Sequence, residues 1–370
     1  MERNDLKKLF EYHPDHEAVK NRMIAEAKAL YEKGLSNERH QPVFNELKGN
    51  LYKFYLYPTF NCPLRCPYCY AEGGERKSKE LPAEDYLRIT KEAVDAGYKA
   101  VVIVGGEPLV YYEFDKYLDG LAKIEKEKCR FILRTSLAFP IADEKLKKIC
   151  SVFDEITVSI DGDEETHDAV QGKGTFKRVT ENTLRAISFG GYISVSAVMN
   201  REKGEGEPGN YLRSFCKENG IKKLIIQSPV PMGRALDSAV PYYEWRSDER
   251  PMDKIKFQWT CGLGGNLYME PDGKVFPCYA WCEPEHLLGD LSKESLQEIL
   301  DRGELLKYLN TGVDTNKKCH NCEVRYLCGG LCRIWVKDKT DIDSGEFDCS
   351  RIKNGILKKL KQYNIVEENE

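Results

Sequence analysis

The chain has 370 residues, of which 41% are hydrophobic and 31% are charged. This composition is enough for one large core with a smaller module, and it does not fit a disordered chain. The 56 basic and 60 acidic residues give a net charge of −4, which offers none of the basic surface that nucleic-acid binding requires. No apolar run approaches the roughly 18 residues that cross a bilayer, and no signal-peptide core is visible. We therefore expect a cytoplasmic protein that binds neither nucleic acid nor a membrane.

Fourteen cysteines call for an explanation. A large chain without a secretion signal does not fit a disulfide scaffold, so metal or cluster ligation is the expected use. Cys129, Cys150 and Cys216 are exceptions because each falls alone in an apolar segment, where cysteine serves as a small buried hydrophobe.

In chain order, residues 16–34 have the pattern of an amphipathic helix that ends at Gly34, and residues 35–50 are polar and irregular. Residues 1–50 are thus predicted to be an N-terminal helical extension.

From residue 51 onward, short apolar runs alternate with segments of helical period. The predicted strands are residues 52–58, 99–104, 130–135, 155–160, 192–199 and 222–227. Strands that are each joined to the next by a helix pair in parallel through right-handed crossovers. The pattern predicts an α/β fold, a partial (β/α)6 TIM-like barrel over residues 51–235. In such barrels the chemistry lies in loops at the carboxyl ends of the strands.

The alternation ends after Arg234. Residues 236–260 are polar and contain prolines, so we expect a linker. Residues 261–350 form a cysteine-dense module, and residues 351–370 are predicted to be a charged terminal helix.

Three cysteines, Cys62, Cys66 and Cys69, follow the first predicted strand with the spacing C-x3-C-x2-C. A [4Fe–4S] cluster normally takes four cysteines, so three would leave one iron open to a substrate or cofactor. Zinc is the alternative, but it takes four ligands and usually takes them as C-x2-C pairs.

This loop, with an aromatic residue before its last cysteine, resembles the radical S-adenosylmethionine (radical SAM) superfamily. The resemblance implies that the cluster reductively cleaves S-adenosylmethionine and that the 5′-deoxyadenosyl radical abstracts hydrogen from a substrate. It places Tyr68 against the adenine. Gly105, Gly106, Glu107 and Pro108 match the family's GGEP element, whose backbone and glutamate hold the methionine amine.

Polar residues at the ends of later strands occupy positions where the family contacts the ribose and carboxylate of the cofactor. They are Thr135, Ser136, Ser159, Asp161 and Asn200. Each could also be an ordinary cap or turn residue. Many relatives carry an arginine near residues 170–174 for the cofactor carboxylate, whereas this chain has Gln171.

The C-terminal cysteines read C-x11-G-x4-C, then C-x2-C-x5-C-x3-C, then C. This string is similar to the SPASM extension of radical SAM enzymes, which implies two auxiliary clusters and three [4Fe–4S] clusters in all. The distal ligands would be Cys319, Cys322, Cys328 and Cys349, and the proximal ligands Cys261, Cys278 and Cys332. A pair of zinc knuckles is the alternative. Cys282 could close the proximal cluster, act as a catalytic hydrogen donor, or simply be buried.

Relatives with both modules mature peptides or proteins, and auxiliary clusters suit oxidative outcomes. We expect a ribosomal precursor peptide as substrate and a thioether or C–C cross-link as product. A formylglycine maturase of the anaerobic sulfatase type is an alternative, although Tyr279 replaces the aspartate that acts as base there. A second alternative function is a small-molecule dehydrogenase or ligase of cofactor biosynthesis. A third is a zinc-stabilised binding module that is not an enzyme. Expected partners are a separate leader-binding protein and a flavodoxin or ferredoxin reductant.

Overall fold

The computed structural model describes residues 16–36, 51–75, 79–126, 129–237, 263, 265–309, 312–314, 316–330 and 349–366. The chain divides into two compact units. Described residues 51–237 and 265–304 belong to the first unit, and described residues 16–36, 263 and 305–366 belong to the second.

The first unit is built on one sheet with the strand order β6-β5-β4-β3-β2-β1-β7-β8-β9. The first six strands run parallel, each beside the next in sequence, which confirms the predicted partial barrel. They are β1 (Lys53–Leu56), β2 (Ala100–Ile103), β3 (Arg130–Thr135), β4 (Glu155–Ser159), β5 (Ile193–Val198) and β6 (Leu224–Gln227). Each lies within a predicted strand range.

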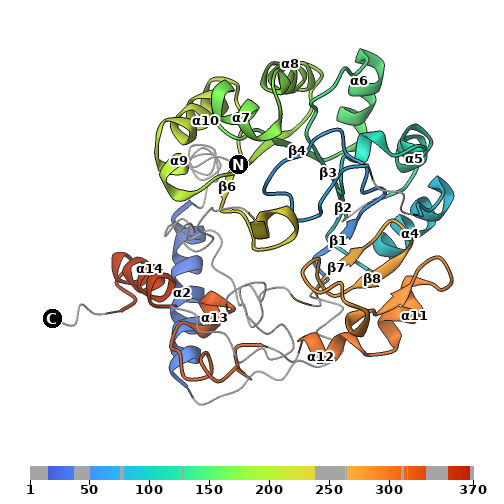
Figure 1. The fold of residues 1–370 in the computed structure, drawn as a ribbon. Coiled ribbons are helices and arrows are strands. Elements are labelled where there is room, and N and C mark those ends of the chain that lie inside the picture. Colours follow the sequence, from blue (N-terminus) through green and yellow to red (C-terminus); the bar gives the residue numbers. More distant parts are fainter. Residues whose placement is uncertain are drawn as a thin grey trace. The chain divides into compact units, whose positions relative to one another are not determined.

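Helices connect these strands and cover one face of the sheet (Figure 1). They are α4 (Ala83–Asp95), α5 (Phe114–Leu121), α6 (Asp143–Val152), α7 (Glu164–Gln171), α8 (Thr175–Ser188), α9 (Arg201–Glu205) and α10 (Glu207–Glu218), with a 3-10 turn η1 (Pro108–Val110). α4 contacts β2, α8 contacts β4 and β5, and α10 contacts β6. Strand residues on the helix-covered face, such as Val101, Ile103 and Leu133, are fully buried, as expected of parallel strands covered by helices.

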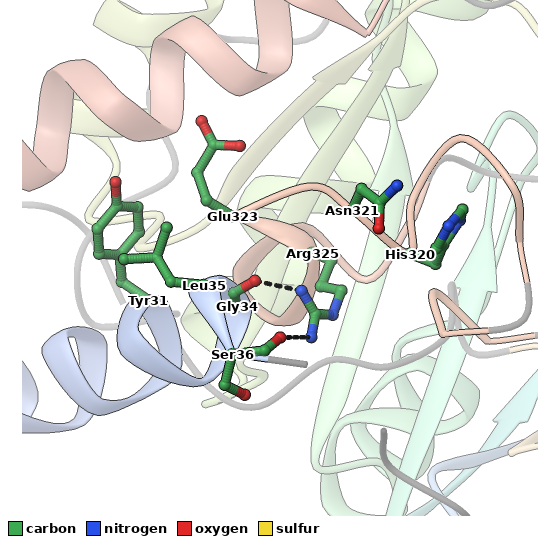
Figure 2. A pocket seen from close by; sticks show the side chains of 8 residues that line it. All are labelled: Tyr31, Gly34, Leu35, Ser36, His320, Asn321, Glu323 and Arg325. Atoms are coloured by element: carbon green, nitrogen blue, oxygen red, sulfur yellow. Dashed lines mark hydrogen bonds between the residues drawn. The ribbon is translucent and has the colours of Figure 1, made fainter. Parts of the chain in front are cut away.

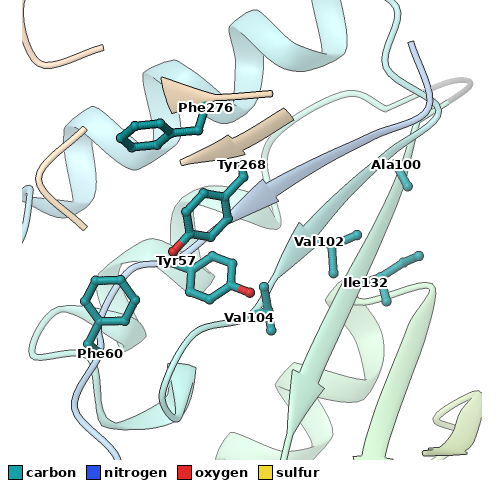
Figure 3. Close-up of a cluster of buried hydrophobic side chains, with 8 residues drawn as sticks. All are labelled: Tyr57, Phe60, Ala100, Val102, Val104, Ile132, Tyr268 and Phe276. Carbon is teal, nitrogen blue, oxygen red and sulfur yellow. The ribbon is translucent and has the colours of Figure 1, made fainter. Parts of the chain in front are cut away.

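The opposite, inward face carries an apolar cluster made by residues of β2, β3, β7 and β8 and of the segments that follow β1 and β2 (Figure 3). Its members are Tyr57, Phe60, Ala100, Val102, Val104, Ile132, Tyr268 and Phe276. Because side chains alternate along a strand, Ala100 and Val102 share this face while Val101 does not. We call this set the inward cluster.

Three further strands were not predicted from the sequence. β7 (Asn266–Met269) pairs in parallel with β1, and β8 (Lys274–Phe276) and β9 (Gly289–Asp290) continue the sheet in antiparallel fashion. Gly273 allows the turn between β7 and β8, since its φ is +97°. A 3-10 turn η4 (Pro284–His286) and α11 (Leu296–Asp301), whose Ser295 and Glu298 form a capping box, complete this part. Residues 265–304, which the cysteine spacing assigns to the C-terminal module, thus belong to the same compact unit as the barrel.

The second unit contains α2 (His16–Leu35), α12 (Leu305–Leu309), α13 (Arg325–Cys328) and α14 (Ser350–Gln362). The helices predicted near each end of the chain are therefore present. α2 packs against α13, and the buried Arg325 of α13 donates hydrogen bonds to the carbonyl oxygens of Lys33, Gly34 and Ser36. These are carbonyls that a helix end leaves without partners. No helix in the described ranges has the length and apolar character to cross a bilayer.

Candidate active site

The three-cysteine loop, residues 60–74, leaves the carboxyl end of β1 and closes on itself. The Gly74 N–H donates to the Phe60 carbonyl at 3.0 Å, and the Cys62 N–H donates to the Gly74 carbonyl at 3.2 Å. Backbone N–H groups also reach two sulfurs at 3.4 Å, from Leu64 to Cys62 Sγ and from Gly73 to Cys69 Sγ. Such donors stabilise thiolates and tune a bound cluster.

The thiols of this loop fit an iron cluster in their chemistry. Burial raises the pKa of Cys62 to about 11 and that of Cys66 to about 12, and a bound cation would favour their thiolate forms. Within the described ranges, no three cysteine, histidine or carboxylate side chains are arranged to hold one metal ion. A cubane binds each thiolate through a separate iron, so its sulfurs lie further apart than the ligands of one ion.

Arg234, which was not predicted as a site residue, donates hydrogen bonds to backbone carbonyls of the cysteine loop. It lies in the 3-10 turn η2 (Gly233–Asp237) after β6. Its Nε donates to the Cys66 carbonyl at 2.9 Å, its Nη1 donates to the Gly73 carbonyl at 3.0 Å, and its backbone N–H donates to the Cys69 carbonyl at 3.1 Å. The only hint in the sequence is a Gly-Arg pair directly after the sixth strand.

Gly105 and Gly106 allow the loop after β2 to lie directly on the start of the cysteine loop. The Gly106 N–H donates to the Thr59 carbonyl at 2.9 Å, and the Glu107 N–H donates to the Asn61 carbonyl at 2.8 Å. A Cβ at either glycine would overlap a carbonyl oxygen of residues 59–61. The two glycines therefore have a packing role besides the cofactor contact predicted for them.

Glu107 connects three of the predicted cofactor residues. Its carboxylate is 1% exposed and accepts hydrogen bonds from Thr135 Oγ1 at 2.7 Å, Ser136 Oγ at 2.6 Å and the Ser136 N–H at 2.7 Å. Burial raises the pKa of Glu107, and the hydrogen bonds from Ser136 and Thr135 oppose that shift. These donors orient a buried carboxyl group at the carboxyl ends of β2 and β3.

Asp161, after β4, contacts one other predicted cofactor residue, Tyr68, and also Gln171. Tyr68 Oη donates to Asp161 Oδ2, Gln171 Nε2 donates to the same oxygen at 2.7 Å, and the Val198 N–H donates to Oδ1 at 2.7 Å. The Asp161 N–H donates to His167 Nδ1 at 3.1 Å. Gln171, the residue that departs from the family pattern, therefore lies beside Tyr68 and Asp161. Its buried Oε1 accepts no hydrogen bond from the described residues.

The remaining predicted cofactor residues have ordinary structural contacts. Asn200 caps α9 by accepting a hydrogen bond from the Lys203 N–H at 2.9 Å, Pro108 opens η1, and Ser159 pairs with Ser196 in the β4–β5 register. No contact in the described ranges tests their cofactor roles, so these stay predictions.

Cys278 and Cys282 lie in the turn after β8, in the same unit as the cysteine loop. The Cys282 thiol donates to the Tyr279 carbonyl at 3.3 Å. Cys282 and Tyr279 pack against the inward cluster, as does Tyr70, the residue after Cys69. The ring centroids of Tyr70 and Tyr279 are 4.9 Å apart, so the two cysteine-bearing turns are in contact.

The second unit carries four predicted distal ligands, Cys319, Cys322, Cys328 and Cys349. The first three lie on successive turns, and the Cys322 N–H donates to the Cys319 carbonyl at 2.8 Å. Beside them, the end of α2 and residues 320–325 together line a pocket of about 230 Å³ (Figure 2). Cys261 and Cys332 lie outside the described residues.

Family models match both parts of the chain. Residues 56–206 match the Radical SAM superfamily, and residues 261–323 match the SPASM iron-sulfur cluster-binding domain. The protein is therefore a radical SAM enzyme, a class that binds iron-sulfur clusters and S-adenosylmethionine. More closely, it belongs to the radical SAM enzymes that carry a SPASM domain, and the zinc-module interpretation is wrong.

Named relatives fall into more than one functional group. The probable GTP 3′,8-cyclase of Saccharolobus islandicus (strain M.14.25 / Kamchatka #1) is 30% identical over 202 residues, which are 54% of this chain and 64% of that relative. The PqqA peptide cyclase of Methylorubrum populi is 24% identical over 317 residues, 74% of this chain and 78% of the relative.

A solved structure shares the fold. Streptococcus suis SuiB bound to its precursor peptide SuiA superposes with a TM-score of 0.63 at 18% identity, covering 82% of this chain and 78% of SuiB.

Proposed function

We propose that this enzyme forms an oxidative cross-link, a thioether or a C–C bond, in a ribosomal precursor peptide. Three [4Fe–4S] clusters would serve it, one on Cys62, Cys66 and Cys69 and two on the SPASM cysteines. When bound, the first cluster supplies the electron that cleaves S-adenosylmethionine. Tyr68, Glu107 and Asp161 are proposed to position the cofactor.

The contact between the Cys278–Cys282 turn and the cysteine loop carries this proposal. Tyr70 and Tyr279 meet on the inward face, so the turn that carries Cys278, a predicted ligand of an auxiliary cluster, contacts the cysteine loop. A cross-link removes two protons and two electrons from the substrate: one hydrogen atom goes to the 5′-deoxyadenosyl radical, and the second electron needs an acceptor when the other proton is released. An acceptor beside the reacting carbon suits that balance, whereas simple hydrogen return needs none.

Two observations support a peptide as the substrate. PqqA peptide cyclase aligns over most of both chains, and the SuiB fold was solved with its precursor peptide.

The residue after Cys278 is Tyr279, and its ring packs against Tyr70. A phenol in that position is no general base near neutral pH, which disfavours the formylglycine reaction.

A small-molecule substrate is the second candidate, favoured by the 30% identity to a probable GTP 3′,8-cyclase. That match spans 54% of this chain, whereas PqqA peptide cyclase aligns over 74% of it.

The test is to incubate the reduced, anaerobically reconstituted enzyme and S-adenosylmethionine with candidate precursor peptides encoded beside its gene. We expect each event to remove two hydrogens from the peptide and to yield one 5′-deoxyadenosine. Gain of one deuterium in heavy water without mass loss would mean epimerisation. Turnover of GTP or of a free amino acid alone would contradict the peptide proposal.

A further inference from the structure

Arg134 places a positive charge on the inward face of the barrel. It is the next-to-last residue of β3, two positions after Ile132 of the inward cluster, so both side chains lie on the same face. Its guanidinium carbon lies 5.7 Å from the centroid of the Tyr55 ring on β1. Tyr55 itself packs against the inward cluster, and a cation over an aromatic ring is held in place electrostatically.

This guanidinium has no anionic partner in the part of the chain that the structure describes. Arg134 Nε is buried there without a hydrogen-bond acceptor, and the ion pairs of the described residues do not include Arg134. Arginine stays protonated at every physiological pH. A buried, charged donor without a partner is costly and calls for a reason.

The three buried carboxylates among the described residues are all engaged elsewhere. Glu107 accepts hydrogen bonds from Leu109, Thr135 and Ser136. Asp161 accepts them from Tyr68, Gln171 and Val198. Glu155 pairs with Arg130 and Lys223 and accepts a hydrogen bond from Ser194. The inward face also holds Lys53, whose pKa burial lowers to about 8, with the charge of Arg134 adding to that shift. This face therefore has positive charge in excess.

We propose that Arg134 binds a carboxylate of the substrate and fixes its position beside the reacting centre. Under the proposed function, that carboxylate belongs to an aspartate, a glutamate or the C-terminus of the precursor peptide. The planar guanidinium accepts a carboxylate in bidentate fashion, and burial strengthens the pair. The next residue, Thr135, donates to Glu107, so Arg134 lies on the same strand end as a predicted cofactor residue. Arg134 is thus a specificity residue.

The cofactor also carries a carboxylate, so the test must separate the two sources. It uses the full chain, reconstituted anaerobically, as wild type and as Arg134→Met. Arg130→Met is the matched control, because Arg130 lies on the same strand and face but pairs with Glu155 at 3.1 Å. Glutarate serves as a probe that resembles a glutamate side chain.

The first measurement is thermal unfolding. Arg134→Met should raise the melting temperature by about 1–3 °C because it removes a half-buried guanidinium whose Nε is buried without an acceptor among the described residues. Arg130→Met should lower the melting temperature because it leaves Glu155 with one partner fewer. Glutarate should stabilise the wild type and Arg130→Met but not Arg134→Met. A lower melting temperature of Arg134→Met together with an unchanged glutarate response would overturn the proposal.

The second measurement is kinetic. In Arg134→Met, the KM for S-adenosylmethionine in peptide-free 5′-deoxyadenosine formation should be unchanged. The KM for the precursor peptide should rise about 10- to 100-fold. In the same variant, replacing the anchoring aspartate or glutamate of the peptide by asparagine or glutamine should not raise this KM further. A tenfold or larger rise in the KM for S-adenosylmethionine would assign Arg134 to the cofactor instead. If no peptide is processed, the proposed function fails, while the glutarate and cofactor measurements still decide the role of Arg134.

Discussion

Cys282 is the residue whose role the cysteine spacing leaves open. Its thiol packs against the inward cluster and donates to the Tyr279 carbonyl, four residues from the predicted ligand Cys278. By contrast, Cys150 and Cys216 are buried in helices α6 and α10, on the outer layer of the barrel. The location of Cys282 favours a ligand or hydrogen-donor role over simple burial.

Replacing Cys282 by alanine should lower the yield of modified product about tenfold or more, because a shift of reacting groups by about 1 Å already costs on the order of 100-fold. Iron content separates the two roles: loss of iron indicates a ligand, and retained iron indicates a donor. Cys216→Ala is the control and should change stability but not yield. Full iron and full yield in Cys282→Ala would make the residue a bystander.

Much of the candidate site could be predicted, because its residues follow strand ends in recognisable patterns. Glu107 and the consecutive residues Thr135 and Ser136 were predicted from two separate segments and lie together in the structure, as do Tyr68 and Asp161. Arg134 and Arg234 were not singled out. Arg134 lies inside a predicted strand, where the pattern indicates secondary structure and not a site. Arg234 donates to backbone carbonyls, which every residue has, so the sequence does not identify its partners.

At the scale of elements, the cysteine loop depends on a distant segment. Gly233 and Arg234 of η2 contact its backbone, and a Cβ at Gly233 would come within 2.6 Å of the Cys69 carbonyl oxygen. The guanidinium donates to the Cys66 and Gly73 carbonyls. Residues after β6 therefore help to set the spacing of thiols that follow β1.

Replacing Arg234 by methionine should loosen this loop, because it removes two charge-assisted hydrogen bonds worth about 1.5–3 kcal/mol each. We expect faster iron release to a chelator and less 5′-deoxyadenosine, with auxiliary iron retained. Arg213→Met is the control, since Arg213 of α10 donates to Asn210 and to the Gly204 carbonyl, away from the cysteines. Equal iron release from the two variants would contradict the role assigned to Arg234.

The six parallel strands could be predicted because strands buried on both faces leave continuous runs of valine, isoleucine and leucine. β8 and β9 were missed because they have only three and two residues, and β7 because it lies in the segment that the cysteine spacing assigns to the C-terminal module. Such strands depend on pairing with β1 and with one another for their stability, and local sequence carries little of that information.

At the scale of the molecule, the predicted auxiliary ligands are divided between the two units. Cys278 belongs to the first unit, whereas Cys319, Cys322, Cys328 and Cys349 belong to the second. Within the second unit, Arg325 fastens the end of α2 to the segment that carries Cys322. The N-terminal helix is therefore part of the support of the distal ligands.

This division predicts how iron is lost from variants. The reconstituted wild type should contain about twelve irons if three cubanes form. Alanine at Cys62, Cys66 and Cys69 should remove about four irons and abolish 5′-deoxyadenosine formation, because the cluster with the open iron is lost. Alanine at Cys319 and Cys322 should also remove about four irons yet leave cofactor cleavage partly intact, because these residues belong to the other unit. Iron analysis, electron paramagnetic resonance and 5′-deoxyadenosine assays would measure this. If both sets of variants lost cofactor cleavage alike, the first cluster would depend on the distal one, and the separate roles proposed for the two units would be wrong.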